Sequence, residues 1–332
     1  MSKKRLNRRK ALFTILSLCF IVPGVAVLIR NLIGKLSSKP NSNSSPNLKT
    51  LTGPQSRSLL IIDQTGQESE KTISIYSQEL NADTILELVK IEGGKNQFGS
   101  DLKEIGHLDS EEPKFLVTIP EFYMSLYPIT QEQWEAVMGD NPSTFQGQMN
   151  LPVETVSWDD AQKFCEELRN KTGKNYRLPS ETEWEYACRA DTITPFYFGN
   201  DISFEQANYD TNYDYAYKNK IGSKTSTNCP ANYLARTTPV GEFRGNQFGL
   251  YDMHGNVWEW CEDAWMKNHS QTPHDGTVRP HDPNKHKQAV IRGGSWHSFP
   301  ARCRSAAREG MWKNMKSNRI GFRVVMEIKN VT

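Results

Sequence analysis

Apolar and polar positions divide the chain into stretches of three kinds. Residues 11–29 carry no charged side chain, and this run lies within the ~17–25 residues that a helix needs to cross a bilayer. Residues 36–57 are rich in Ser, Asn, Pro and Lys, which is typical of a flexible linker. Dense apolar patterning then runs from about residue 84 to residue 326. The pattern therefore predicts one large domain at 84–326, behind an apolar segment and a linker.

Shorter stretches complete this division. Residues 1–35 combine a basic cap with the apolar segment, and residues 327–332 form a C-terminal tail. Residues 58–83 lead into the domain. The alternation of apolar and polar residues within 71–80 predicts a strand there.

Three helix starts are predicted within the domain. In each, a hydroxyl residue is followed three positions later by a residue that can bond back, which is the capping-box arrangement or its Asp variant. The pairs are Thr130 with Gln133, Ser157 with Asp160, and Ser180 with Glu183. Each predicted helix has a Trp near its first turn, and we expect these three side chains to pack in the core: Trp134, Trp158 and Trp184.

The remaining pattern indicates little regular structure. Short strands are predicted at 115–119 and 122–127. After residue 190 the sequence becomes rich in Gly, Asn, Tyr and Pro, with few long periodic segments. We therefore expect an α+β domain with low regular secondary structure, stabilised by the burial of aromatic side chains.

The charges are unevenly distributed. Residues 1–39 contain nine Lys or Arg and no acidic residue, so the rest holds 31 basic and 38 acidic residues, a net charge near −7. An acidic body argues against nucleic-acid binding. The basic residues within 3–10 favour a cytoplasmic N-terminus, which places the domain on the extracytoplasmic side of a membrane.

We interpret the apolar segment as an uncleaved membrane anchor. A cleaved signal peptide is the alternative, which is disfavoured because no convincing small-x-small cleavage site is present. The pair Arg8-Arg9 also resembles a twin-arginine export signal, although the rest of that motif is poor. A buried core helix is disfavoured too, because the preceding basic residues would then serve no purpose.

Cysteine and histidine positions exclude several common sites. The six cysteines form no C-x-x-C pair, which argues against a zinc ribbon and a dense disulfide framework and favours buried thiols. Residues 267–290 are polar and hold four of the seven histidines. Their spacing matches no compact metal site, so we expect a solvated loop.

Six motifs occur in a fixed order along the domain. They are IPEFYMSLYPIT at 119–130, RLPSETEWEYACR at 177–189, FGLYDMHGNVWEW at 248–260, RGGSW at 292–296, CRSAAR at 303–308 and IGFRVV at 320–325. This ordered set resembles the sulfatase-modifying-factor family, which includes the formylglycine-generating enzyme, over about residues 84–326. The resemblance implies an irregular variant of the C-type-lectin fold that usually carries calcium.

The resemblance also implies calcium ligands. Asp252 and Glu259 match the side-chain ligands of one family site, and Gly255 and Val257 match its carbonyl donors. Such oxygen donors suit calcium, which takes about 6–8 of them. The alternative is that the two carboxylates cap or pair within the turn. A second family site begins at Asn208, but no acid stands at the position of its carboxylate partner.

The family's catalytic thiols are missing. The resemblance implies an oxidase that converts a substrate cysteine to formylglycine with copper held by two cysteines. Ser298 occupies the first of these positions, and the segment 297–302 is about three residues shorter than in the family and has no cysteine. Cys303 belongs to the next motif and is a poor substitute. Serine cannot replace a thiolate on copper(I), a soft ion, so we expect no copper and assign no catalytic residue.

Two other branches of this fold bear on function. One consists of non-haem iron oxidases with histidine ligands. Here only His254 and His297 lie in the relevant motifs, so we do not expect iron. The other is non-catalytic and consists of variable proteins diversified by retroelements, which present a binding surface. The pattern of residues 292–325 resembles theirs, although Glu309 and its neighbours do not fit such diversification.

These resemblances predict a binding face at about residues 296–319. Aromatic and Arg side chains dominate binding hot spots, so we expect contacts from His297, Ser298, Phe299, Arg302 and Trp312. The alternative is that Trp312 packs internally and Arg302 is solvated. The expected function is a membrane-tethered module that binds a protein, peptide or glycan and is not an enzyme. The competing hypothesis is a formylglycine-generating or iron-dependent oxidase.

The resemblance also suggests cysteine pairings. A family cysteine at the position of Cys188 bridges to one at the position of Ser305, and Cys303 lies two residues away as an alternative partner. Cys165 matches another family half-cystine whose partner position is Val324, so we expect a free buried thiol there.

Overall fold

The computed structural model describes residues 52–215, 233–280, 282 and 284–328. They belong to the unit Thr50–Thr332. The apolar segment at 11–29 and most of the predicted linker lie outside the described residues. Among the described helices, none combines the length and the apolar character that a membrane crossing would need.

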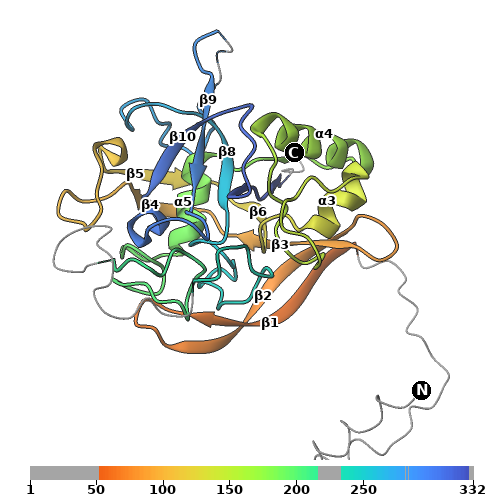
Figure 1. Ribbon diagram of the computed structural model, residues 1–332, viewed down its shortest axis with the longest axis horizontal. Coiled ribbons are helices and arrows are strands. Elements are labelled where there is room, and N and C mark those ends of the chain that lie inside the picture. The colour runs from red at the N-terminus through yellow and green to blue at the C-terminus, as the bar shows by residue number, and fades with distance from the viewer. Residues whose placement is uncertain (1–51, 216–232, 281, 283, 329–332) are drawn as a thin grey trace, which may run out of the picture. The chain divides into compact units, whose positions relative to one another are not determined.

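An antiparallel sheet of six strands joins the two ends of the described chain (Figure 1). Its order is β1-β2-β3-β6-β12-β7, and β1 pairs with β2 from Gly53 opposite Ser77 to Ile62 opposite Glu68. The linker prediction is corrected for residues 53–57, because their backbone pairs with β2 although their side chains show no apolar pattern. The strands are β1 Gly53–Ile62, β2 Glu68–Glu79, β3 Ile85–Ile91, β6 Phe122–Ser125, β12 Val325–Glu327 and β7 Tyr176–Arg177.

Two smaller sheets complete the described strands. The four-stranded sheet has the order β10-β9-β8-β11, in which β11 pairs with β8 in parallel. A two-stranded sheet joins β4 and β5. The strand predicted at 115–119 is confirmed as β5, and the one predicted at 122–127 ends at Ser125. The strands are β8 Trp258–Ala264, β9 Gln288–Arg292, β10 Arg308–Trp312, β11 Ile320–Gly321, β4 Gly94–Phe98 and β5 Phe115–Ile119.

All three predicted capping boxes are present. In each helix the hydroxyl accepts from the backbone N–H three residues on, and that residue's side chain accepts from the cap's own N–H. The two exchanged bonds satisfy donors that a helix start would otherwise leave unpaired. The helices are α3 Gln131–Met138, α4 Trp158–Thr172 and α5 Glu181–Arg189, and two 3₁₀ turns are η1 Asp109–Glu111 and η3 Pro300–Cys303.

The helices bury their aromatic side chains as predicted. Trp134 of α3 stacks on Phe164 of α4 with ring centroids 5.5 Å apart, and both rings meet Phe322 edge-on. Trp184 of α5 is fully buried in the other core cluster, while Trp158 is half-buried at the edge of the first. Two apolar clusters, rather than one, therefore fill the described fold.

Helix α5 is buried along its whole length, charges included. Every residue from Glu181 to Arg189 is buried, and the helix contacts β4, β5, β8 and β9. Glu185 forms ion pairs with Arg189 and with Arg292 of β9, and both oxygens of Glu181 accept from Arg308 of β10. Buried carboxylates need such partners, because an unpaired buried charge is costly. The motif arginines thus tie two strands to one central helix.

The histidine-rich stretch at 267–290 is not simply a solvated loop, so that expectation is corrected. His269 is buried against Phe98, with ring centroids 4.5 Å apart, and burial lowers its pKa well below the usual value. His274 stacks on Phe115 at 4.2 Å. The polar composition of the stretch did not indicate these contacts, because an imidazole can either pack on an aromatic ring or face water.

Candidate functional site

The turn before β8 is built on an unusual backbone. Asp252, Gly255 and Asn256 all have positive φ, at 57°, 82° and 63°. A Cβ on Gly255 would lie 2.3 Å from the carbonyl oxygen of Asn208, so glycine is required there. The N–H of Asn256 donates to that same carbonyl at 2.7 Å. The turn is therefore clamped onto the chain at Asn208, the residue predicted for the second calcium site.

The side chain of Asn208 is also committed to this clamp. Its Nδ2 donates to the carbonyl of Arg236 at 3.0 Å and lies 3.4 Å from the Oδ1 of Asn256. Asn256 in turn accepts from the N–H of Thr238 at 3.0 Å. Asn208 thus holds the turn by its backbone and its side chain together.

Asp252 carries the feature that best fits a cation. The N–H of Gly241 donates to its Oδ2 at 2.7 Å, whereas its buried Oδ1 has no hydrogen-bond partner. Burial raises the pKa of this carboxyl to about 6. An acceptor without a donor is costly in the interior, and a metal ion bound to it would remove that cost.

Glu259 is engaged differently. Arg323 donates to both of its oxygens, at 2.6 and 2.8 Å, and the indole of Trp184 donates to Oε2 at 2.6 Å. All three side chains are buried. Glu259 is thus ion-paired, but with Arg323, 64 residues away, and not within the turn as the alternative had it. Its Oε1 accepts only one of these bonds and keeps a lone pair that a cation could use.

The loop at 297–302 turns its serine inward. The Oγ of Ser298 accepts from the N–H of Ser295 at 3.0 Å and lies 3.1 Å from the Ser295 hydroxyl. The thiol of Cys303 is buried, donates to the carbonyl of Phe299, and has a pKa raised by burial. No pair of thiols faces this loop within the described residues, and Ser298 stabilises the loop rather than exposing a contact group.

Several predicted contact residues do reach the surface. Phe299 is 42% exposed and Trp312 is 53% exposed, so the internal packing considered for Trp312 is not observed. Arg302 forms an ion pair with Glu309 of β10 at 2.9 Å. His297 is exposed, and its Nδ1 lies 2.7 Å from the hydroxyl of Tyr233.

Sequence reasoning missed two aromatic neighbours of this loop. Tyr213 packs edge-on against Phe299 with ring centroids 4.4 Å apart, and Tyr233 stacks towards Trp296 at 6.4 Å. Both tyrosines precede the loop by more than sixty residues, and no motif marks them. Only the abundance of Tyr after residue 190 hinted at an aromatic surface.

His254 is not available as a metal ligand. It is buried, its Nδ1 bonds the carbonyl of Cys303 at 2.7 Å, and its Nε2 accepts from the N–H of Tyr197 at 3.1 Å. Burial lowers its pKa to about 3, which keeps the ring neutral. Nδ1 thus ties the turn to η3, and Nε2 ties it to the segment after α5.

The cysteines behave as buried thiols. Cys165, Cys188, Cys261 and Cys303 are all free and buried. The thiol of Cys188 lies 3.6 Å from the hydroxyl of Ser305 and forms a weak hydrogen bond with it. The two positions at which the resemblance implied a disulfide are therefore neighbours, joined by a hydrogen bond. The alternative bridge from Cys188 to Cys303 is absent.

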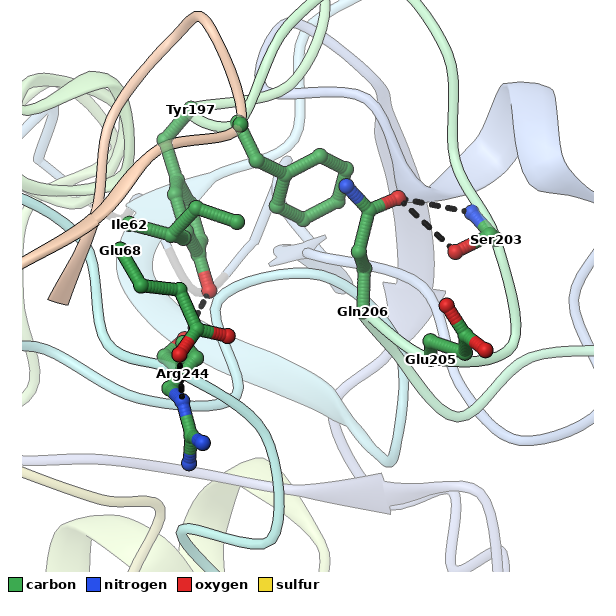
Figure 2. Close-up of a pocket in the computed structure, with 9 residues that line it drawn as sticks. Ile62, Glu68, Tyr197, Ser203, Glu205, Gln206 and Arg244 are labelled. Carbon is green, nitrogen blue, oxygen red and sulfur yellow. Dashed lines mark hydrogen bonds and ion pairs between the residues drawn. The ribbon is translucent and has the colours of Figure 1, made fainter. Parts of the chain in front are cut away.

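A separate cavity of about 210 Å³ lies between the β1–β2 turn and the segment after α5 (Figure 2). Five of its polar residues are paired with one another. Arg244 bonds Glu68 at 3.0 Å, its carbonyl accepts from the hydroxyl of Tyr197, and Gln206 accepts from Ser203. None of the predicted site residues lines this cavity.

Comparisons with known proteins agree on the fold. The family model described as "Sulfatase-modifying factor enzyme 1-like domain" matches residues 76–328. The chaperone protein LppX of Paenibacillus barcinonensis is 34% identical over 224 residues, which is 55% of this chain and 71% of that protein. The formylglycine-generating enzyme of Mus musculus is 32% identical over 200 residues, or 59% of this chain. The chain spans only 49% of the mouse enzyme's length.

Solved structures place the described unit in the same architecture. PvdO from Pseudomonas aeruginosa superposes with a TM-score of 0.64 and 29% identity, over 76% of this chain and 98% of that one. Treponema denticola variable protein 1 superposes with a TM-score of 0.62 and 23% identity, over 76% and 99%. The second likeness concerns the fold alone. Together they confirm the predicted α+β architecture.

Proposed function

The chain belongs to the sulfatase-modifying factor enzyme 1-like domain family, and on that premise we propose that it is a membrane-tethered, extracytoplasmic ligand-binding module without oxidase activity. One observation carries the proposal. Where a copper oxidase needs a thiolate, Ser298 is buried and bonded to Ser295, and the thiol of Cys303 is buried as well. Neither group is placed to hold copper(I).

Exposed side chains of the predicted binding face, in the loop at 297–302 and at the end of β10, support binding in place of chemistry. Phe299 and Trp312 leave aromatic surface in water, which association with a partner would cover. His297 and the paired Arg302 supply polar groups at the rim. The partner is a protein, peptide or glycan, and the relative named as a chaperone favours a protein.

Metal and oxygen measurements on the purified full chain test the absence of oxidase activity. We expect neither stoichiometric copper nor iron, and no oxygen consumption with a thiol reductant and a cysteine-containing peptide. Mouse formylglycine-generating enzyme, assayed in parallel, is the positive control. Stoichiometric copper with oxygen uptake would establish the oxidase instead.

Site-specific photo-crosslinking tests the binding face. A photoreactive phenylalanine analogue replaces Phe299 or Trp312 in cells that produce the full chain. Leu60 of β1, 47% exposed, serves as the control position. We expect one discrete adduct from positions 299 and 312 and none from the control. Adducts from all three positions alike would mean that the face has no special role.

We also propose that calcium binds the turn before β8. Asp252 supplies its unpartnered Oδ1, Glu259 supplies the lone pair left by Arg323, and the carbonyls of Gly255 and Val257 complete the donor set. All four donors are oxygen, which suits a hard ion. The ion would brace the turn and perform no redox step.

The membrane tether is tested by fractionation. We expect the full chain to sediment with membranes and a chain lacking residues 1–35 to be soluble. In right-side-out vesicles, external protease should reach the domain. Protection of the domain there would reverse the proposed orientation.

A further inference from the structure

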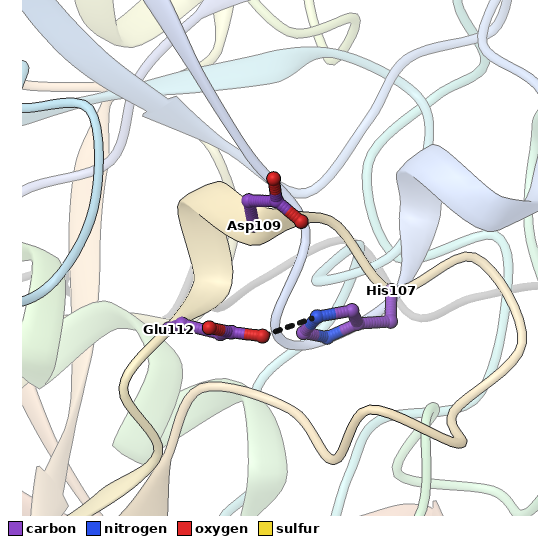
Figure 3. Close-up of side chains that lie close together, drawn as sticks. All are labelled: His107, Asp109 and Glu112. Atoms are coloured by element: carbon purple, nitrogen blue, oxygen red, sulfur yellow. Dashed lines mark hydrogen bonds and ion pairs between the residues drawn. The ribbon is translucent and has the colours of Figure 1, made fainter.

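Three side chains with metal-binding atoms meet in the loop between β4 and β5 (Figure 3). They are His107, Asp109 and Glu112, and one ligand atom of each lies within 4.8 Å of the others. Among the described residues, no other group of three His, Cys, Asp or Glu side chains converges in this way. The η1 turn creates the cluster, because it folds residues 107 and 112 back towards each other.

Hydrogen bonds fix which nitrogen of His107 faces the cluster. Ser100 donates its only hydroxyl proton to Glu111, a carboxylate that Arg304 grips through both oxygens. Ser100 must therefore accept from the Nδ1 of His107, which lies 2.7 Å away. In the protonated ring Nε2–H donates to Glu112, whereas in the neutral ring the proton on Nδ1 leaves a lone pair on Nε2. A second-shell hydrogen bond of this kind is what orients most metal-binding histidines.

In the neutral ring the lone pair on Nε2 faces another acceptor. Oε1 of Glu112 lies 3.1 Å from it, and Figure 3 shows the ring and the carboxylate facing one another. Two acceptors at this distance repel unless a cation lies between them. Neighbouring ligands of a first-row metal ion, each ~2.1 Å from it, are about 3.0–3.4 Å apart, so the observed spacing fits an ion as well as a shared proton.

We propose that His107, Asp109 and Glu112 form a binding site for a divalent transition-metal ion such as Zn²⁺. One imidazole and two carboxylates suit zinc, whereas calcium takes oxygen donors and copper(I) prefers sulfur. Asp109 is exposed and Glu112 is partly exposed, so water completes the coordination and the ion enters from solvent.

The site would stiffen a loop that contacts the proposed binding face. The carbonyl of Gly106 accepts from Arg304, and a Cβ on Gly106 would lie 2.8 Å from the Cβ of Ala301 in η3. The carbonyl of Ile105 accepts from Tyr215 at 2.7 Å. An ion held by the three ligands thus stabilises the segment at residues 105–106, against which η3 and its loop pack.

Zinc titration of the full chain tests this proposal. The untagged protein is stripped with chelator, returned to excess calcium to fill oxygen-only sites, and titrated with ZnCl₂ by calorimetry. We expect one zinc per chain and a zinc-dependent rise in Tm. Asp109→Asn should weaken binding by more than about tenfold, since even second-shell changes typically cost roughly 10–100-fold.

Matched variants separate the site from incidental binding. Asp83→Asn removes another exposed carboxylate in a loop and should leave zinc binding unchanged. His107→Gln should abolish binding. If that variant fails to fold, Asp109→Asn still decides, because its side chain is exposed. Equal zinc affinity in wild type and Asp109→Asn, or no zinc binding by wild type, would mean that the gap holds only a proton.

Discussion

At the residue scale, several positions of the turn before β8 accept few side chains. Its positive φ values and the contact between Gly255 and Asn208 leave little freedom of sequence. The motif at 248–260 places Gly255 and Asn256 next to each other, and that much is local information. The partner that closes on Gly255 lies 47 positions earlier, so no local pattern could name it.

Replacing Gly255 with Ala should destabilise the protein by about 3 kcal/mol or more, since it adds a clash with the Asn208 carbonyl to an unfavourable φ. Gly66→Ala is the matched control, because Gly66 has a similar φ of 80° and open space around it. That change should cost only about 1–2 kcal/mol. Denaturant unfolding measures both, and equal losses would show that the clash is relieved.

Asp252 gives a prediction about pH and calcium. Its folded pKa of about 6 lies above the ordinary 3.8, so the folded state holds the proton more tightly than the unfolded state. Without calcium, stability contributed by this group is greatest below pH 4 and falls as pH rises to 6. The loss is about 3 kcal/mol by pH 7.

Asp252→Asn should remove this pH dependence and make the calcium-free protein at least as stable at pH 7. Calcium should raise the Tm of wild type and not that of the variant, if the proposed site exists. Thermal unfolding with and without chelator measures both effects. A calcium response that survives in Asp252→Asn would place the ion elsewhere.

At the scale of elements, the helix starts were predictable and the charged core was not. A capping box is complete within four residues, so the pairs at 130, 157 and 180 appear in the sequence itself. Ion pairs such as Arg323 with Glu259 join β8 to the connection between β11 and β12, 64 residues away. Arginines in a motif look like surface charges until their partners are known.

Arg323→Met tests the charged core. It leaves the buried Glu259 without a partner and should cost ~3–5 kcal/mol. Arg57→Met is the matched control, because Arg57 also grips a carboxylate, Glu87, but at an exposed position. That change should cost about 0–1 kcal/mol. Similar losses in chemical denaturation would refute the special weight given to burial.

At the scale of the molecule, the architecture could be predicted only through the family resemblance. The six-stranded sheet pairs β12, near the end of the chain, with β6 and β7, and it takes in a hairpin from the predicted linker and lead-in. Periodicity identifies strands but not their order across 270 residues. The absence of cysteine from residues 297–302 is visible in the sequence, whereas the inward Ser298 and the two tyrosine neighbours of this loop required the structure.

The anchoring of that loop has a consequence for how the protein can change. Arg292 before it grips Glu185, and Arg304 after it grips Glu111, so its two ends are fixed by contacts that its exposed side chains do not share. Natural variation at positions 297, 299 and 302 therefore carries little folding penalty. Recognition can therefore be changed at these three positions without loss of the fold, whereas replacing either arginine would take an ion-pair partner from a buried carboxylate.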